Sequence, residues 1–417
     1  MHDLAWLLSP FETARFFDHI WQQRPAMVAT GRPTHFRALF SKAAVERILE
    51  FAQPQAPAVR VASAASQEKV EVPLSPNGRI NVDQLRKLYL GGHTVILNSV
   101  EDFDPAVSQL ARAIETEMGA RVQVNAYLTP ASAQGFKAHY DTHDVLVAQV
   151  EGEKRWRIYG GESVCPLNEL VDGDPRVRDL ADPQIEMCLR PGDLFYIPRG
   201  WVHEAATDAT ASLHLTFGLH PPLAKDLLQA SLDALVARRP ELREALPVGP
   251  LSSAERRPLL QQHFARLVEM FAADALVSDA VETIDDQLLR RGRTGGDGHL
   301  FEDPDRLDQL AGQSRLQRRS NLPCRVLQAD NELGLQFVNS LIKGPAEFGP
   351  ALRFVAQSIE PFSVADLPGL SPDLQIALAT ALIADGICRM HVDEVASSAE
   401  FSPGRMPGLQ PERVTAA

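Results

Sequence analysis

The sequence predicts an α+β protein, with a β-barrel or sandwich in its first half and helices after it. Residues 121–219 hold short strand-forming runs separated by Gly and Pro, and residues 223–290 repeat apolar side chains at helical spacing. At 417 residues the chain is long enough for two or three domains. We expect domains at 1–220, 221–300 and 301–400, with a flexible tail at 401–417.

Helices are expected before the barrel. Ser9 can cap a helix that begins at Pro10, and Glu12 would complete a capping box. Other short helices are predicted at residues 43–52, 81–90 and 105–118, with a strand at 94–98.

The barrel prediction depends on a period-2 pattern. Apolar residues alternate with Gln123, Asn125 and Tyr127 across residues 121–128, as in a strand with two different faces. Further strands are expected at residues 145–150, 155–159, 184–189, 193–197, 203–206 and 212–219. Several short strands with turn residues between them favour a closed or two-sheet β structure.

The second half contains two helical units. The apolar stripe of residues 223–289 indicates a helical bundle or hairpin, which could also form a dimer interface. Residues 291–298 have the composition of a linker. Helices at 346–359, 363–367 and 371–385, followed by a strand at 387–392, form a winged-helix pattern. The third of these helices contains no Lys or Arg, which argues against DNA binding and favours a packing or partner-binding role.

Charge and cysteine content indicate the kind of partner and compartment. The net charge of -13 argues against a nucleic-acid-binding surface and suits a basic peptide or protein. No apolar run is long enough to span a membrane, and we expect no signal peptide. The 4 cysteines are scattered without a CxxC pair, so we expect reduced thiols in a cytoplasmic protein.

His139 and Asp141 form an HxD pair. On a strand, side chains two residues apart project from the same face, so both could reach one metal ion. Imidazole and carboxylate together suit a divalent metal of borderline hardness. Taken alone, the HxD pair is a weak signal, because it also occurs by chance.

A second motif lies about sixty residues later. Gly192, Pro198, Gly200 and His203 have the spacing G-x5-P-x-G-x2-H, which resembles the second motif of the cupin superfamily. The glycines and proline would turn the chain between strands, and His203 would then begin a strand that faces the barrel interior. This histidine supplies a possible third ligand.

The first cupin motif is present in altered form. His139 and Gly152 fit its spacing, but Asp141 replaces the second histidine and Val145 replaces the glutamate. The ligand set is thereby reduced to His139, Asp141 and His203, which leaves coordination positions open. His143 could be a ligand, a substrate contact or a hydrogen-bonded structural histidine.

Three segments, at residues 125–130, 139–141 and 149–156, resemble the JmjC oxygenases, and more narrowly the cupin-like ribosomal oxygenases. The resemblance implies a double-stranded β-helix (JmjC/cupin barrel), then a helical dimerisation segment and a C-terminal winged helix. It also implies Fe(II), 2-oxoglutarate and O2 as reactants, with oxidative decarboxylation to succinate and CO2 coupled to hydroxylation.

The resemblance assigns further residues to the cosubstrate pocket. Lys154 stands where the family places the basic residue that pairs with the distal carboxylate of 2-oxoglutarate. Asn125 and Tyr127 share a strand face at positions that line the same pocket, and Ser212 is a weaker candidate. From the residues alone, these three could equally be polar core residues with hydrogen-bond partners.

The expected function is therefore an Fe(II)/2-oxoglutarate-dependent hydroxylase acting on a protein side chain, plausibly Arg or His of a basic ribosomal protein, as a homodimer. Thr142 and His143 follow Asp141 where the ribosomal enzymes often carry acidic residues, so a small molecule or another peptide stays open as substrate. Two other hypotheses are a cupin that uses iron without 2-oxoglutarate, and a non-catalytic metal-binding or winged-helix protein that binds a partner.

Overall fold

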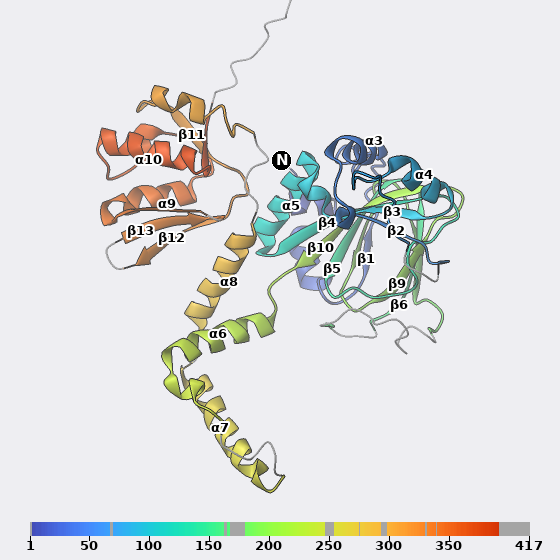
Figure 1. The fold of residues 1–417 in the computed structure, drawn as a ribbon, viewed down its shortest axis with the longest axis horizontal. Helices are drawn as coiled ribbons and strands as arrows, with labels where there is room; N and C mark the ends of the chain where they lie inside the picture. The colour runs from blue at the N-terminus through green and yellow to red at the C-terminus, as the bar shows by residue number, and fades with distance from the viewer. Residues whose placement is uncertain are drawn as a thin grey trace, which may run out of the picture.

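The chain forms a β-barrel, a group of helices that leaves it, and a smaller C-terminal unit of helices and strands (Figure 1). The computed structural model describes residues 2–66, 70–161, 165–166, 180–246, 254–274, 276–292, 298–329, 332–338 and 340–391. The expected tail at 401–417 and residues 293–297 of the expected linker lie outside the described residues.

The barrel consists of two antiparallel sheets in a cupin-like arrangement. The larger has the strand order β1-β8-β5-β10-β4-β3-β2, and the smaller has the order β7-β6-β9. The strands of the larger sheet are β1 (Ala26–Val28), β2 (Val59–Ala62), β3 (Thr94–Leu97), β4 (Arg121–Thr129), β5 (Asp144–Glu151), β8 (Leu194–Ile197) and β10 (Ser212–His220). Those of the smaller sheet are β6 (Lys154–Gly160), β7 (Ile185–Leu189) and β9 (Val202–Ala206). Each expected strand is present, to within two residues.

The N-terminal helices lie against the larger sheet (Figure 1). They are α1 (Leu4–Leu8), α2 (Thr13–His19), α3 (Lys42–Arg47), α4 (Val82–Leu90) and α5 (Pro105–Met118), and a π-helical turn, Ile48–Ala52, continues α3. The helix expected to begin at Pro10 begins instead at Thr13, without a side-chain cap. Ser9 closes the preceding helix α1, whose N-terminus is capped by Asp3. The capping-box prediction was wrong because α1 uses Ser9 as its C-terminal boundary.

The two faces of β4 and β10 differ in polarity. Apolar residues such as Val124 and Leu215 pack into the main core with the N-terminal helices. The other face of β4 carries Asn125 and Tyr127, which pair with Thr216 and His214 of β10. This polar face is turned toward the smaller sheet and holds the candidate site.

The helical segment is formed by α6 (Ala224–Arg238), α7 (Arg257–Asp274) and α8 (Val277–Arg291). In Figure 1 it extends away from the barrel, and α8 leads back toward the C-terminal unit. Phe264, Val268 and Leu228 are among the large exposed apolar residues of this segment. Within the part of α7 that the structure describes, no side chain is buried.

The C-terminal unit has more strands than expected. Its elements are β11 (Arg315–Arg318), β12 (Cys324–Ala329), β13 (Glu332–Phe337), β14 (Ser340–Pro345), α9 (Gly349–Gln357), β15 (Phe362–Ser363), α10 (Pro372–Ala384) and β16 (Cys388–Met390). They form two three-stranded sheets, β12-β13-β14 and β15-β11-β16. The helix expected at 363–367 is a single 3-10 turn, Val364–Asp366, after β15. The alternation of Leu333, Leu335 and Phe337 was the available signal for the first sheet.

Short 3-10 turns complete the described chain, at Ala56–Ala58, Val100–Asp102, Pro240–Arg243, Ala254–Arg256, Pro304–Gln309 and Ala346–Phe348. Among the described helices, none combines the length and the apolar character needed to cross a bilayer.

Candidate metal centre

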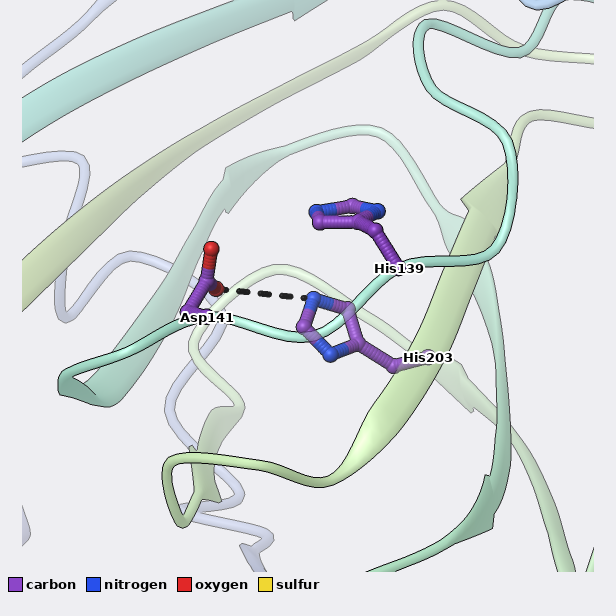
Figure 2. A group of neighbouring side chains, drawn as sticks. All are labelled: His139, Asp141 and His203. Atoms are coloured by element: carbon purple, nitrogen blue, oxygen red, sulfur yellow. Dashed lines mark ion pairs between the residues drawn. The ribbon is translucent and has the colours of Figure 1, made fainter. Parts of the chain in front are cut away.

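His139, Asp141 and His203 converge at one end of the barrel. One ligand atom from each lies within 4.8 Å of the others, and Figure 2 shows the three side chains grouped around one space. His203 Nε2 lies 3.7 Å from Asp141 Oδ2. His203 is on β9, as expected. His139 and Asp141 lie just before β5 and not within a regular strand, although His139 forms an isolated bridge to His203.

Both imidazoles are oriented by main-chain carbonyl groups. Nδ1 of His139 lies 2.8 Å from the carbonyl oxygen of Lys137, and Nδ1 of His203 lies 2.9 Å from that of Trp201. Each Nδ1 therefore carries the proton and donates it, so each Nε2 is left with a free lone pair. A hydrogen bond from the ring nitrogen that does not bind the metal usually fixes the tautomer of a metal-binding histidine.

The charge states also suit a cation. Burial, followed by the nearby His139, lowers the pKa of His203 to about 4, so its imidazole is neutral at pH 7. Burial raises the pKa of Asp141, but the neighbouring His203 and His139 outweigh it and hold this pKa below its usual value. A neutral imidazole at His203 and an ionised carboxylate at Asp141 are protonation states that suit a divalent metal. The donor set fits a 2-His-1-carboxylate iron site.

His143 is not part of this group. The chain bends at residues 142–143, so the straight strand on which His143 would have faced the metal does not form. Its ring stacks instead on His220, with 4.4 Å between ring centroids. Of the alternatives left open for His143, a place among the ligands has no support in this geometry.

Two turns depend on glycine: Gly192 precedes β8, and Gly200 precedes His203 on β9. Gly192 and Gly200 both have positive φ, at 90° and 82°. A Cβ at Gly192 would lie 2.2 Å from the carbonyl oxygen of Arg32, so no side chain fits there. The glycines of the motif therefore place β9, and with it His203, opposite His139.

A cavity extends from the three ligands into the barrel. Its lining is Thr94, Tyr127, Gly135, Phe136, His139, Asp141, Val145, Val147, Lys154, Trp156, Ile197, His203, Ala205, His214 and Thr216. Lys154 is 5% exposed and donates to Thr129 Oγ1 at 3.0 Å. Burial lowers the pKa of Lys154 to about 7. A buried ammonium with one hydrogen bond is well suited to bind an anionic group of a small ligand.

Of the other residues expected in the pocket, the structure places Tyr127 on its wall. Asn125 is two residues before Tyr127 on β4 and is not part of the cavity lining. Its side chain accepts a hydrogen bond from the Ser99 amide at 3.1 Å. Ser212 lies outside the cavity lining, whereas His214 and Thr216, further along the same face of β10, belong to it. The buried Ser212 hydroxyl accepts a hydrogen bond from Gln149 at 2.8 Å.

His214 and Trp156 were not expected in this pocket. His214 stacks on Tyr127 at 4.9 Å, and the plane of Trp156 is steeply inclined to it. His214 Nδ1 and Trp156 Nε1 are buried and have no hydrogen-bond partner among the described residues. Unpaired buried nitrogen atoms in the same cavity as Lys154 again indicate a polar ligand, since such groups are costly to leave unsatisfied. The available signal was the alternation along residues 212–220, where even-numbered positions share a face.

The candidate site lies within a segment that is similar to a known domain family. The JmjC domain family matches residues 97–227, a segment that contains both histidines, Asp141 and Lys154. This match confirms the resemblance to the JmjC oxygenases that residues 125–130, 139–141 and 149–156 carry.

Curated proteins that are similar to this chain include ribosomal oxygenases and a bifunctional demethylase and hydroxylase. Ribosomal oxygenase 1 of Rattus norvegicus is 30% identical over 251 residues, which cover 58% of this chain and 42% of the relative. The bifunctional lysine-specific demethylase and histidyl-hydroxylase NO66 of Drosophila mojavensis is 29% identical, over 69% of this chain and 34% of the relative. Ribosomal oxygenase 1 of Danio rerio is 26% identical, over 92% and 78%. The chain thus spans less than half the length of the first two relatives.

Solved structures share the fold over most of this chain. The ycfD structure of E. coli has a TM-score of 0.54 at 18% identity, covering 91% of this chain and 98% of that one. The ribosomal oxygenase YcfD of Escherichia coli in complex with cobalt and 2-oxoglutarate has a TM-score of 0.51, covering 92% and 99%. At this identity the likeness concerns the fold.

Proposed function

We propose that the protein is an Fe(II)- and 2-oxoglutarate-dependent dioxygenase that hydroxylates a protein side chain. The proposal depends on one observation: the three candidate metal ligands and the buried Lys154 line the same cavity. Three protein ligands leave positions for a bidentate cosubstrate and O2, and a buried cation suits the second carboxylate of that cosubstrate. The YcfD complex with cobalt and 2-oxoglutarate supports this choice.

Each residue has a distinct role in the proposal. His139, Asp141 and His203 hold Fe(II) through the two Nε2 atoms and a carboxylate oxygen. Lys154 binds the distal carboxylate of 2-oxoglutarate. Iron and the 2-oxo acid supply the oxidising chemistry when bound, with O2 as the second cosubstrate.

The aromatic wall excludes water from the reacting centre. Trp156 and His214 are buried, and His214 stacks on Tyr127 and meets the ring of Trp156 edge-to-face, so aromatic rings fill this side of the cavity. A dry, preorganised site holds the reacting groups close and limits competing reactions.

A ribosomal protein is the substrate class we propose, with Arg or His as the modified residue. The names of the relatives from Rattus norvegicus and Drosophila mojavensis support it. The net charge of -13 also favours a basic protein over an acidic one as partner.

Mass spectrometry of ribosomal proteins from cells with and without the gene tests this assignment. The expected result is one ribosomal peptide that lacks the mass of a single oxygen atom when the gene is absent. Unchanged ribosomal proteins would contradict the substrate. Release of succinate from 2-oxoglutarate by the purified protein tests the oxygenase activity separately.

The proposal includes a homodimer formed through the helical segment. A largely apolar cavity of 450 Å³ between α6 and α7 is lined by Leu228, Phe264 and Val268, among others. Exposed apolar side chains gathered on two neighbouring helices are typical of a protein interface.

We also propose that the C-terminal unit is winged-helix-like and binds a protein partner, not DNA. α10 is followed by β16, which pairs with β11, and α10 contains no Lys or Arg. A cytoplasmic location belongs to the same proposal and is supported by cysteines that are all free.

A further inference from the structure

A second polar cavity lies beside the metal centre, where the barrel meets the helical segment. It has a volume of 300 Å³ and is walled by Arg121, His143, Arg199 and His220 on the barrel side and by Gln287 and Leu288 of α8. We call it the Arg121 pocket. It shares no lining residue with the cavity of the metal centre.

The same pair of strands lines both cavities. Tyr127 pairs with His214 at the metal end, and Arg121 pairs with His220 at the far end. The metal-binding segment also leads from one to the other, since His143 follows Asp141 by two residues. On β10, four residues separate Thr216, which lines the metal cavity, from His220. At about 3.3 Å per residue, these spacings place the Arg121 pocket about two to four residues of extended peptide from the metal cavity.

The wall between the cavities is closely packed. The ring of His143 stacks on His220 and covers Gly218, where a Cβ would lie 2.9 Å from the His143 ring. Gly218 therefore allows the two imidazoles to stack. The stack lies between the metal-binding segment and Arg121, since His143 follows Asp141 by two residues and His220 pairs with Arg121.

Two nitrogen atoms of the Arg121 pocket lack hydrogen-bond partners among the described residues. His220 Nε2 and Arg199 Nε are buried and have no hydrogen-bond partner in the described structure. Arg199 Nε lies 3.9 Å from a carboxylate oxygen of Asp144. The lining carboxylate, Asp226, accepts from the Leu223 amide at 2.8 Å and lies 3.2 Å from Lys225 Nζ.

Arg121 is exposed on the open side of the pocket and adds a second cation. Two guanidinium groups match a ligand that brings oxygen acceptors, and His220 Nε2 can donate to the same ligand in the tautomer that carries the proton there. A Lys or Arg side chain of a ligand would have to pair with Asp226, whose carboxylate already contacts the Leu223 amide and Lys225.

We propose that the Arg121 pocket receives a carboxylate or amide side chain of the polypeptide substrate, two to four residues from the residue that is hydroxylated. The inference rests on the proposed hydroxylase function and adds a sequence requirement to it. Because α8 forms one wall, the helical segment takes part in choosing the substrate. The overall acidic charge attracts a basic protein, whereas this pocket selects an acidic or amide side chain near the target.

The test uses fluorescein-labelled nonapeptides with a central arginine or histidine. A single glutamate is moved through the flanking positions, and matched series carry glutamine, leucine or lysine there. Binding to the Mn(II)- and 2-oxoglutarate-loaded protein is measured by fluorescence anisotropy without oxygen. We expect glutamate or glutamine to bind about tenfold more tightly than leucine at one position, two to four residues from the centre.

Variants identify the pocket as the source of that preference. Arg121→Met and His220→Phe should abolish it, and Arg121→Glu should reverse it in favour of lysine. Arg86→Met, which removes an exposed arginine from α4, should leave it unchanged. Arg121 is exposed, so its variants keep the fold even if His220→Phe does not.

A preference that is absent in the wild type, or that survives Arg121→Met and Arg121→Glu, would overturn the proposal. Succinate release without peptide separates this outcome from failure of the hydroxylase function. Turnover without a positional preference would contradict only the proposed role of the Arg121 pocket. A positional preference without turnover would contradict the proposed hydroxylase function and would support the Arg121 pocket as a peptide-binding site.

Discussion

The main chains of His139 and His203 hydrogen-bond to each other in both directions, at 3.0 Å from the His139 amide and 2.8 Å from the His203 amide. The two residues are far apart in sequence, and this pair of bonds fixes their separation. Their imidazoles consequently lie 4.6 Å apart between ring centroids, on the same side as Asp141.

Removal of one ligand should abolish metal binding at this position. His139→Ala is expected to weaken Fe(II) or Mn(II) affinity by about 100-fold or more, because even outer-shell partners contribute about 10–100-fold. Isothermal titration under anaerobic conditions measures the affinity. His143→Ala is the matched control, and an equal loss there would mean that His143 is a ligand.

Loss of the buried cation should affect the cosubstrate and spare the metal. Lys154→Met is expected to raise KM for 2-oxoglutarate by about 10–100-fold, since a charge-assisted hydrogen bond contributes about 1.5–3 kcal/mol. The metal affinity of this variant should stay that of the wild type. Lys137→Met removes an exposed lysine near His139 as a control, and an unchanged KM in Lys154→Met would exclude this role.

Cosubstrate binding should depend on pH through Lys154. Its pKa is lowered to about 7 in the ligand-free protein, so the amine is charged below pH 7 and neutral above it. The dianionic cosubstrate binds the charged form and raises this pKa, so affinity should fall by up to about tenfold per pH unit above pH 7.

Titration calorimetry in two buffers of different ionisation enthalpy measures the linked proton. We expect proton uptake on 2-oxoglutarate binding above pH 7, and none in Lys154→Met. Proton release, or the same uptake in the variant, would show that another group titrates.

A charge on α7 should prevent dimer formation. The Phe264 side chain is 66% exposed and lies beside the apolar cavity between α6 and α7. Phe264→Glu is expected to convert a dimer into a monomer, as measured by light scattering during gel filtration, because a buried unpaired carboxylate is costly. Glu269→Ala, at an exposed position of the same helix, should remain dimeric. A wild-type monomer would contradict the proposed dimer.

The C-terminal unit is attached to α8 through Asp286. One oxygen of Asp286 accepts from Gln336 at 2.6 Å and Arg325 at 3.3 Å, and the other accepts from Arg290 at 2.6 Å. Asp286→Ala should lower the free energy of unfolding by about 1–2 kcal/mol, since these groups are only partly shielded from solvent. Urea denaturation measures this loss.

Limited proteolysis of the same variant should show earlier cleavage between α8 and the C-terminal unit. Asp308→Ala, which changes an exposed carboxylate outside this contact, serves as the control. Equal stability of both variants would show that the unit is held by apolar packing.

The sequence by itself determined the strands of the barrel and the identity of the three candidate ligands. Alternation along residues 121–128 and 212–219 reflects one face against a core and one against a cavity, and that pattern is local. The spacing from Gly192 to His203 is also local, because positive φ and close approach to Arg32 require glycine at one fixed position.

Tertiary structure decided which polar residues meet. Strand register places His214 opposite Tyr127 in the cavity wall, and register is set by pairing between strands distant in sequence. Ser212, two residues before His214 on the same face, lies outside the cavity. The bend at residues 142–143 sends His143 to His220, and the packing of α8 on the barrel closes the Arg121 pocket. Contacts of this kind join residues far apart in the chain, so no local pattern encodes them.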